Sequence, residues 1–335
     1  MLFSSKGLGT VSKKIAVVTG YAGFIGLTFT RRLLEEGYHV YCIDKFSYVS
    51  NILEADRLHQ EYHERMHWVQ DDITEITWLP ECDVIFNLAA ESDVDISNKN
   101  SKAFINTNIE GVRNLLSIIN ERIVIRADKP LFFQVSTDEV YGDTMNGSFN
   151  ESSPLNPSNP YSSTKAAADL LIQSWARTYG LDYIIARPSN NYGENQYPEK
   201  LIPLACKRLS RGKKIKLHNN GNPVRTWTHV EDTANALITL YEKAERNRIY
   251  NISSEYEQNN YETVRKIVNT YFMGNVKRNV PDFEEHLDLS YNRPGQDVRY
   301  AITCEPLRQL GWEPQKVFDE EITSLVKYYK EGFIW

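Results

Sequence analysis

The chain has 335 residues, of which 41% are hydrophobic and 24% are charged. This length and composition predict one large or two closely associated folded domains, and they exclude an extensively disordered chain. The formal net charge is −6, from 38 basic and 44 acidic residues, so we expect no nucleic-acid partner, because such surfaces need clustered basic charge.

The cysteines and the N-terminal residues concern compartment and targeting. The four cysteines lie far apart, without a CxxC pair or histidines at metal-ligand spacing, so the sequence predicts neither a metal site nor a disulfide framework. Residues 1–12 predict a flexible tail without the apolar core of a signal peptide, and no run reaches the ~18 apolar residues of a spanning helix. We therefore expect a cytoplasmic protein with no membrane partner.

The first predicted unit is a strand, a helix and a second strand. The β-favouring run 15–19 is followed by Gly20, Gly23 and Gly26 at GxxGxxG spacing, and the second strand ends at Asp44. Such glycines let the backbone approach a pyrophosphate, and the amides of the next helix face its charge. An acid after the second strand suits a ribose hydroxyl pair and would repel a 2′-phosphate. The unit therefore predicts a site for NAD rather than NADP.

Strands and helices continue to alternate through the first half of the chain. Strands are expected at 67–69, 84–88 and 131–135, with a helix at about 107–120 before the third. Repeated units of this kind predict an α/β fold with a Rossmann-like, doubly wound parallel sheet, whose ligands bind where the strands end. The cofactor residues expected around the glycines and in these loops are Phe24, Ile25, Asp72, Ile73, Leu88, Ala89 and Ala90.

Two of these assignments have structural alternatives. Asp72 is expected at the adenine edge of the cofactor, and Ala89 and Ala90 beside its diphosphate or ribose. From residue type alone, an N-cap at Asp72 and simple tight packing of the alanines are equally good interpretations.

Three polar residues, Thr137, Asp138 and Glu139, follow the apolar strand 131–135 directly. Adjacent carboxylates repel each other and each needs a hydrogen-bonded environment, so stability alone is a poor reason for this ending of a core strand. The structural alternative is a solvated loop or a helix N-cap with acids in its first turn. At a sheet edge where ligands bind, the two acids are candidates for acid–base chemistry.

Tyr161 and Lys165 stand four residues apart at the head of the helical run 166–179. This spacing puts both side chains on one helix face. A lysine cation beside a phenol favours phenolate, so we expect Tyr161 to act as a base well below its reference pKa of ~10. The same YxxxK pattern often marks a solvated helix face, and only the upstream dinucleotide unit favours the functional interpretation.

The second half of the chain has a different composition. It predicts a strand at 181–186, a strand, loop and strand at 213–225, a helix from 230 to about 244, a strand at 249–252, and helices at 261–272 and 320–330. We predict an NAD-binding domain from residues 13–190 and about 226–252. Residues 191–225 and 253–335 are expected to form a smaller, interleaved α/β domain, whose basic residues either bind a diphosphate or are solvated.

Several motifs together resemble the extended short-chain dehydrogenase/reductase superfamily, and within it the nucleotide-sugar 4,6-dehydratases of the dTDP-glucose type. The glycine loop GYAGFIG and the Tyr161/Lys165 pair carry the superfamily resemblance. The narrower resemblance comes from LAAES (88–92), STDEVYGD (136–143), NPYSSTKAAAD (159–169), SNNYG (189–193), YPEKLIPL (197–204) and RPGQDVRYAI (293–302). The motifs occur in order from about residue 14 to 329.

The resemblance implies roles for five residues. Tyr161, assisted by Lys165, would remove the proton from the sugar O4 while hydride leaves C4 for NAD, and Thr137 would hydrogen-bond O4. The 4-ketone acidifies the C5 proton, which Glu139 would take, while Asp138 would protonate the departing C6 hydroxyl. Hydride then returns to C6, leaving a 4-keto-6-deoxy sugar and regenerated NAD. Elimination needs one protonated and one ionised carboxyl group, and two neighbouring carboxyls in a desolvated cleft have their pKa values pushed apart.

The resemblance further implies a nucleotide-sugar substrate and a homodimer formed through the helices near Thr107 and Tyr161. The implied substrate-binding residues are Ser92, Asn191, Lys200, Leu201, Arg225, Asn260 and Arg293. Arginine suits a diphosphate because its planar fork binds phosphate oxygens in pairs.

The sequence departs from the family pattern at four positions. Asp93 and Gln296 stand where histidine is usual, Ile96 where arginine is usual, and Tyr21 where glycine is usual. The first three leave dTDP-glucose, UDP-glucose and UDP-N-acetylglucosamine open as substrates, with the two glucosides favoured. Tyr21 should be tolerated if its side chain points outward. The alternatives are a C4-epimerase or uronate decarboxylase of the same superfamily, and a non-catalytic NAD- or sugar-nucleotide-binding protein.

Overall fold

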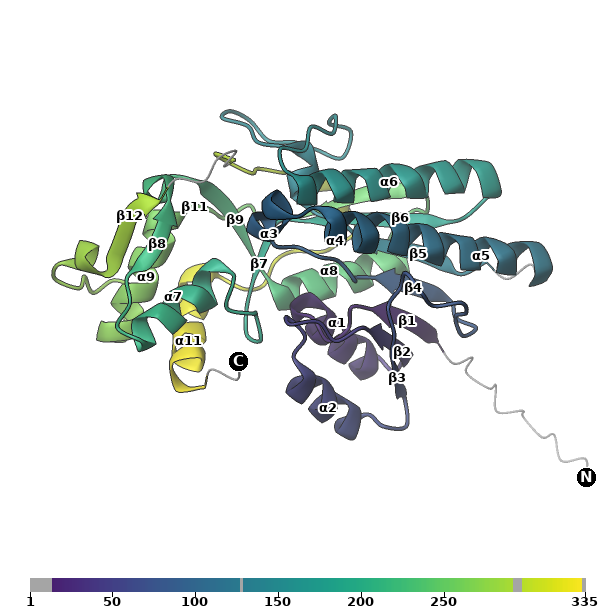
Figure 1. Cartoon of the computed structure of the whole chain (residues 1–335), viewed down its shortest axis with the longest axis horizontal. Helices are drawn as coiled ribbons and strands as arrows, with labels where there is room; N and C mark the ends of the chain where they lie inside the picture. The colour runs from purple at the N-terminus through teal and green to yellow at the C-terminus, as the bar shows by residue number, and fades with distance from the viewer. Residues whose placement is uncertain (1–13, 127–128, 292–296, 333–335) are drawn as a thin grey trace, which may run out of the picture.

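A computed structural model describes residues 14–126, 129–291 and 297–332. It has a large part built on a seven-stranded sheet and a smaller part of short strands and helices, which lies at the left in Figure 1. The predicted tail at residues 1–12, together with Arg293 and Gln296, lies outside the described residues.

The seven-stranded sheet is entirely parallel, and its strand order is β10-β6-β5-β4-β1-β2-β3. Its strands are β1 (Ile15–Thr19), β2 (His39–Asp44), β3 (Met66–Gln70), β4 (Val84–Asn87), β5 (Leu131–Val135), β6 (Tyr183–Pro188) and β10 (Arg248–Ile252). The strand order reverses between β1 and β4, which opens a crevice at their carboxyl ends. The predicted Rossmann-like fold is confirmed.

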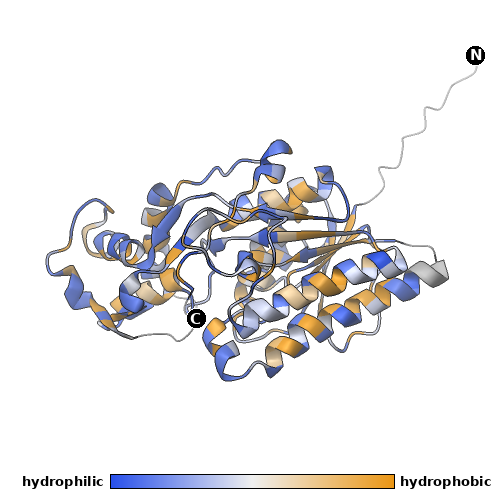
Figure 2. Ribbon diagram, turned by 90° about the horizontal axis from the view of Figure 1, so that it is seen from above, coloured by the Kyte–Doolittle hydropathy of each residue, from blue (hydrophilic) through white to orange (hydrophobic). Residues whose placement is uncertain are grey.

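Helices cover both faces of the sheet (Figure 1). One face carries α1 (Phe24–Glu35), α2 (Ile52–Glu61) and α8 (Val230–Lys243), and the other carries α5 (Val112–Arg126) and α6 (Pro160–Tyr179). Along β1, Ala16 and Val18 belong to the first core and Val17 to the second, because successive side chains of a strand point to opposite faces. Figure 2 shows the strands as a largely hydrophobic layer between helices in which hydrophobic and hydrophilic segments alternate.

The start of α6 is set by strong local signals. Asn159 and Ser162 form a capping box, a proline occupies the first turn, and Gly180 ends the helix with φ +71°. Ahead of α5, the chain forms α3 (Val94–Lys99), α4 (Lys102–Ile105) and a π-helical stretch, Asn106–Gly111. The helix predicted at 107–120 therefore begins in a wider turn, and α2, α3 and α4 were not predicted.

The smaller part contains two short sheets and three longer helices. The sheets pair β7 (Asn190–Tyr192), β9 (Val224–His229) and β11 (Glu257–Asn259), and separately β8 (Ile215–His218) and β12 (Leu287–Tyr291). Its helices α7 (Leu201–Ser210), α9 (Asn260–Met273) and α11 (Phe318–Glu331) enclose a core that includes Tyr192, Trp227 and Phe318. A short helix, α10 (Glu305–Gln309), packs against the large sheet at β10. The domain boundaries stay a prediction.

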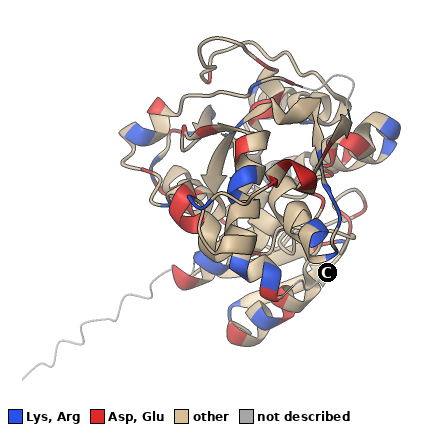
Figure 3. Ribbon diagram, turned by 90° about the vertical axis from the view of Figure 1, so that its left-hand side faces the viewer, with Lys and Arg blue, Asp and Glu red and all other residues tan. Residues whose placement is uncertain are grey.

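The surface charges and the cysteines of the described residues indicate no additional binding site. On the side shown in Figure 3, basic and acidic residues are interspersed along the ribbon. All four cysteines are buried, and none of them forms a disulfide bond within the described residues. No helix in the described ranges has the length and apolar character needed to cross a membrane. Within the same residues, no three His, Cys, Asp or Glu side chains form a cluster that could hold a metal ion.

Candidate active site

One cleft runs along the carboxyl ends of the sheet strands and continues between the two parts of the molecule. Three adjoining cavities make it up: one at Asp44 and Asp72, a central one at Tyr161, and one at Arg225. They are continuous, because the first two share the glycine loop and the last two share Glu139 and neighbouring residues. Every sequence-predicted site residue that the structure describes lines this cleft.

The glycine loop is packed closely against the end of β4. Gly20 has φ +69°, and a Cβ there would lie 2.6 Å from the backbone nitrogen of Ala89. A Cβ on Gly26 would lie 2.1 Å from the Gly20 carbonyl oxygen. Helix α1 begins after Gly23, which has no capping side chain, so its first amides open onto the cleft. This arrangement fits a pyrophosphate.

Asp44 ties the glycine loop to the end of β2. Its Oδ2 accepts from the Ala22 amide at 3.0 Å, and its Oδ1 accepts from the Phe46 amide at 2.8 Å and from Ser50 Oγ at 3.2 Å. Burial raises the pKa of Asp44, and these hydrogen bonds oppose the rise. The carboxylate lies at the cleft wall where a cofactor ribose was predicted.

Lys45 is a cleft residue that the sequence reasoning missed. Its Nζ donates to Glu91 at 2.9 Å and to Thr107 Oγ1 at 3.2 Å, and lies 3.7 Å from Asp72. The ammonium thereby joins the loops after β2, β3 and β4 at the predicted adenosine end. The sequence feature that could have identified Lys45 as a cleft residue was its position directly after Asp44.

The side chain of Tyr21, in the glycine loop, faces inward. The sequence-based expectation was that a tyrosine here would be tolerated with an outward-facing side chain, and this expectation was wrong. Tyr21 is 1% exposed, and its ring packs edge-on against Phe46 with centroids 6.1 Å apart. Phe46 itself has φ +54°, an unusual conformation for a bulky residue. The side chain at position 21 is therefore accommodated by a hydrophobic contact under the loop rather than by solvent.

Thr137 is the N-cap of a short 3₁₀ helix, Asp138–Tyr141, at the end of β5. Its Oγ1 accepts from the Glu139 amide and donates to Asp138 Oδ1, both at 3.3 Å. The Asp138 side chain is 2% exposed, and its Oδ2 has no hydrogen-bond partner among the described residues. Thr137 therefore caps a 3₁₀ helix that has the two acids in its first turn, all three residues also line the cleft, and Asp138 keeps one carboxyl oxygen without a hydrogen-bond partner among the described residues.

The two adjacent acids have different electrostatic environments. Burial and the neighbouring charge of Glu139 raise the pKa of Asp138 to about 8, against the opposing influence of Arg225. Burial also raises the pKa of Glu139, and Arg225 and the Asn159 side chain oppose that rise. Asp138 can therefore hold a proton at neutral pH.

Two residues far away in the sequence contact the Glu139 carboxylate. Asn159 Nδ2 donates to Glu139 Oε2 at 3.4 Å, and the Tyr300 hydroxyl oxygen lies 3.3 Å from the same carboxylate oxygen. Tyr300 donates its one proton to Asp297 through a short contact. Tyr300 and Asp297 were not singled out from the sequence, although both belong to the quoted motif RPGQDVRYAI.

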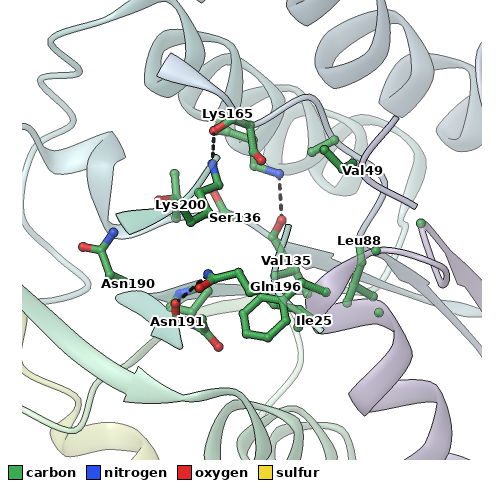
Figure 4. Close-up of a pocket in the computed structure, with 18 of the residues that line it drawn as sticks. Ile25, Val49, Leu88, Val135, Ser136, Lys165, Asn190, Asn191, Gln196 and Lys200 are labelled. Carbon is green, nitrogen blue, oxygen red and sulfur yellow. Dashed lines mark hydrogen bonds between the residues drawn. The ribbon is translucent and has the colours of Figure 1, made fainter. Parts of the chain in front are cut away.

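Tyr161 and Lys165 lie in the first turns of α6, facing the end of β5. Lys165 Nζ donates to the Val135 carbonyl at 2.7 Å (Figure 4), and burial lowers its pKa to about 8 while the charge of Asp169 opposes that fall. Burial and then the charge of Glu139 raise the pKa of Tyr161. This direction is opposite to the one predicted from the YxxxK spacing, because desolvation and nearby carboxylates disfavour the phenolate.

The far end of the cleft holds most of the predicted substrate residues. Lys200 Nζ donates to the Ser92 carbonyl at 3.0 Å, and Gln196 Nε2 donates to the Asn191 carbonyl at 2.9 Å (Figure 4). Arg225 is 9% exposed, and its Nη2 donates to the Asp297 carbonyl at 3.3 Å. The helix-starting residues Leu201 and Asn260 complete this end.

Two positions that depart from the family pattern are also described. Asp93 is the N-cap of α3 and accepts from the Ile96 amide at 2.7 Å. Ile96 is exposed, and only Asp93 lines the cleft. The departure at Asp93 therefore has a structural role as well as a place at the substrate end.

Comparisons with known proteins identify the family. The family model described as GDP-mannose 4,6 dehydratase matches residues 17–325. The low-salt glycan biosynthesis protein Agl12 of Haloferax volcanii is 38% identical over 319 residues, covering 93% of this chain and 97% of that protein. A dTDP-glucose 4,6-dehydratase of Escherichia coli is 35% identical over 343 residues, covering 95% and 94%. The structure of DesIV, a dTDP-glucose 4,6-dehydratase of Streptomyces venezuelae with NAD bound, superposes with a TM-score of 0.86 at 34% identity, covering 95% and 97%.

Proposed function

Since the chain belongs to the GDP-mannose 4,6 dehydratase family, we propose that it converts an NDP-hexose to the NDP-4-keto-6-deoxyhexose and water. It is a sugar-nucleotide 4,6-dehydratase of the extended short-chain dehydrogenase/reductase superfamily, a hydro-lyase with NAD as cofactor. Among NDP-hexoses we favour dTDP-glucose and UDP-glucose. The relatives named as dTDP-glucose 4,6-dehydratases support the first of these.

The observation that carries the proposal is the adjacent pair of Asp138, which is buried, and Glu139, which is half-buried at the cleft wall. Loss of water across C5 and C6 needs an acid for the leaving hydroxyl and a base for the C5 proton in one site. The pKa of about 8 at Asp138 and its unsatisfied Oδ2 support its role as the acid. Glu139, which accepts a hydrogen bond from Asn159 and lies 3.3 Å from the Tyr300 hydroxyl, is then the base.

The oxidation at C4 is assigned to the residues at the head of α6. Tyr161 takes the proton from the sugar O4, and Thr137 hydrogen-bonds the same oxygen. NAD, when bound in the first part of the cleft, would supply the hydride chemistry, by accepting hydride from C4 and returning it to C6. Lys165, held on the end of β5, supplies the positive charge that offsets the burial and the carboxylates that disfavour the phenolate of Tyr161. The resulting 4-ketone acidifies the C5 proton that Glu139 removes.

The cofactor would lie along the first part of the cleft. The amides of the glycine loop and of the first turn of α1 would bind its pyrophosphate, and Asp44 would bind ribose hydroxyls. The close approach of Gly20 to Ala89 supports this assignment, because the loop has no room for a side chain on that face. Asp72, Ile73, Leu88 and Ala90 would complete the cofactor site.

The nucleotide sugar would occupy the far end, with its diphosphate near Arg225 and Lys200. Both cations line the same cavity as Glu139, so a bound diphosphate there would direct the sugar toward the catalytic pair. Ser92, Asn191, Leu201 and Asn260 are assigned to the same substrate site. Arg293, outside the described residues, is assigned to it from the family resemblance.

We also infer a homodimer through the helices near Thr107 and Tyr161. The exposed apolar side chains of Ile105 on α4 and Leu170 on α6, 47% and 57% exposed, support an interface in this region. Sedimentation or light scattering of the purified chain gives its mass directly. A monomer at micromolar concentration contradicts this inference without affecting the proposed reaction.

Mass spectrometry of products formed from a panel of NDP-hexoses tests the proposed reaction. The purified protein is incubated with dTDP-glucose, UDP-glucose, UDP-N-acetylglucosamine and UDP-glucuronate. Loss of one water from a hexose supports the dehydratase. An isomer of unchanged mass indicates a C4-epimerase, loss of carbon dioxide from the uronate indicates a decarboxylase, and NAD binding without turnover of any sugar indicates a binding protein.

A further inference from the structure

Behind the base Glu139, one tyrosine hydroxyl lies between two carboxyl groups. The Tyr300 hydroxyl is 3.3 Å from Glu139 Oε2 and donates to Asp297 Oδ2 through a short contact. Ser158 Oγ donates to the same Asp297 oxygen at 2.6 Å. The arrangement leads without interruption from Glu139, on the 3₁₀ helix after β5, to Ser158 in the loop before α6.

Burial encloses the middle of this arrangement. Tyr300 and Asp297 are 4% and 5% exposed, whereas Ser158 is an exposed residue and Glu139 is half-buried at the cleft wall. When a sugar nucleotide covers the cleft side of Glu139, the groups behind it give its proton a second route to the surface.

We propose that Tyr300 and Asp297 form a proton relay that exchanges the proton on Glu139 with solvent during the reaction. The inference rests on the proposed function, in which Glu139 removes the C5 proton. A phenol has one proton and an oxygen that accepts another, so it can receive from a protonated Glu139 while it donates to Asp297.

The relay conserves atoms and charge at each step. The C5–H bond breaks, its proton joins the Glu139 carboxylate, and its electron pair stays on the sugar as the elimination proceeds. The Glu139 proton then moves to the Tyr300 oxygen as the original Tyr300 proton moves to the Asp297 carboxylate. Asp297 next exchanges its proton with solvent through Ser158, and the reverse sequence returns a solvent proton to Glu139 and then to C5.

Burial and the neighbouring carboxylates favour a neutral Tyr300, with a negative charge on one side or the other, and the nearby Arg225 opposes them. The Arg225 guanidinium lies 4.4 Å from the centre of the Tyr300 ring, and its Nη2 donates to the Asp297 carbonyl at 3.3 Å. Burial, followed by the charge of Glu139, raises the pKa of Tyr300. A standing phenolate is therefore disfavoured, and the two proton transfers are coupled.

The test follows a label rather than the overall rate. A nucleotide hexose that the wild type dehydrates is supplied with deuterium at C5, and the deuterium retained at C5 of the product is measured after a single turnover in ordinary water. We expect the wild type to lose the label to solvent. Tyr300→Phe and Asp297→Asn should each retain it in most of the product, because Glu139 then returns the same deuteron.

A matched control is Tyr256→Phe, which removes a hydroxyl bonded to Gln258 at 2.9 Å in the smaller part of the molecule. This variant should lose the label as the wild type does. A purely structural role of Tyr300 would change kcat, KM or stability, but it would not change the origin of the hydrogen at C5.

Each remaining outcome has a distinct meaning. If both relay variants dehydrate the sugar and lose the label as the wild type does, the relay is wrong while the dehydratase stands. If the wild type dehydrates no sugar, the proposed function fails first. If a variant is folded but does not turn over, a second assay replaces the first: the 4-keto product is added in deuterium oxide, and hydrogen exchange at its C5 is measured. Exchange slower than in the wild type supports the relay. Exchange as fast as in the wild type overturns it. If Tyr300→Phe does not fold, Asp297→Asn decides by the same criterion, and Ser158→Ala decides if neither folds.

Discussion

Arg187 Nε donates to the Asp169 carboxylate at 3.0 Å, and both side chains are excluded from solvent behind the active site. Asp169 lies one helical turn beyond Lys165 on α6. Its charge raises the pKa of Lys165, in opposition to the burial that lowers that pKa to about 8. The ion pair therefore has two roles, since it joins β6 to α6 and keeps a negative charge near the buried ammonium.

Replacing Asp169 with asparagine should destabilise the fold strongly. The substitution leaves the Arg187 guanidinium buried without a counterion, for which a loss of about 3–5 kcal/mol in the free energy of unfolding is expected. Denaturant unfolding measures the loss, and Asp169→Asn combined with Arg187→Met should recover much of it. Glu242→Gln is the control, because its ion pair with Lys14 is exposed and should contribute at most about 1 kcal/mol. An Asp169→Asn loss no larger than the control's would contradict this account.

Tyr161→Phe should abolish C4 oxidation while leaving the fold intact. Removing a general base typically costs a factor of about 10² to 10⁴ in turnover, and reduction of bound cofactor by substrate should disappear with it. NAD binding measured by calorimetry should persist, because only one hydroxyl is removed. Tyr179→Phe, at an exposed position near the end of the same helix, should behave as the wild type. Wild-type turnover in Tyr161→Phe would exclude the tyrosine as the base.

Glu139→Gln should separate oxidation from elimination. The amide cannot take the C5 proton, whereas Tyr161 and Thr137 still act at O4, so reduced cofactor should appear without loss of water. Absorbance of the reduced nicotinamide and mass spectrometry of the sugar measure the two steps independently. Glu245→Gln, which alters only an exposed ion pair with Arg248, should affect neither. Normal product formation by Glu139→Gln would reassign the base.

The large sheet was predictable because its strands are short apolar runs that end in glycines or polar residues. The predicted strand at 15–19 matches β1, and the one at 131–135 matches β5. In contrast, β7 and β11 have three residues each, too few for a periodic pattern. The π-helical stretch Asn106–Gly111 ahead of α5 also leaves no periodic signal.

The site was predictable where chemistry and local spacing coincide, as at Asp138 and Tyr161. Contacts between distant segments were not, because periodicity says nothing about which loops meet. Tyr300 is 161 positions away from Glu139 along the chain, and only the fold brings the two together. Two predictions were wrong for a related reason: that the pKa of Tyr161 is lowered, and that Tyr21 fits with an outward-facing side chain. Both properties depend on burial, which residue type alone does not determine.

The pKa of Asp138 predicts a specific pH dependence. Folding raises this pKa from an ordinary value of 3.8 to about 8, so between these values the native state holds a proton that the unfolded chain releases. The contribution of Asp138 to stability is therefore fully present below pH ~4 and is lost as the pH rises toward ~8. Compared with Asp138→Asn, the wild type should lose more stability between pH 5 and pH 8 in denaturant unfolding. Turnover should fall above pH ~8 as the acid deprotonates, and equal pH slopes in the two proteins would refute the assignment.

Two glycines with similar backbone conformations provide a matched test of the cofactor loop. Gly20 and Gly37 have φ +69° and +86°, so alanine is strained at both positions. Only at Gly20 would the new Cβ meet backbone, at 2.6 Å from the Ala89 nitrogen, whereas nothing lies within 4 Å of a Cβ at Gly37. Both variants should lose about 1 kcal/mol or more of stability through backbone strain. Gly20→Ala should in addition displace the loop from β4 and weaken NAD binding at least tenfold, a loss of about 1.4 kcal/mol of binding free energy. Calorimetric titration with NAD at matched folded fraction separates the two effects, and equal NAD affinity in both variants would show that the close approach of Gly20 to Ala89 does not shape the cofactor site.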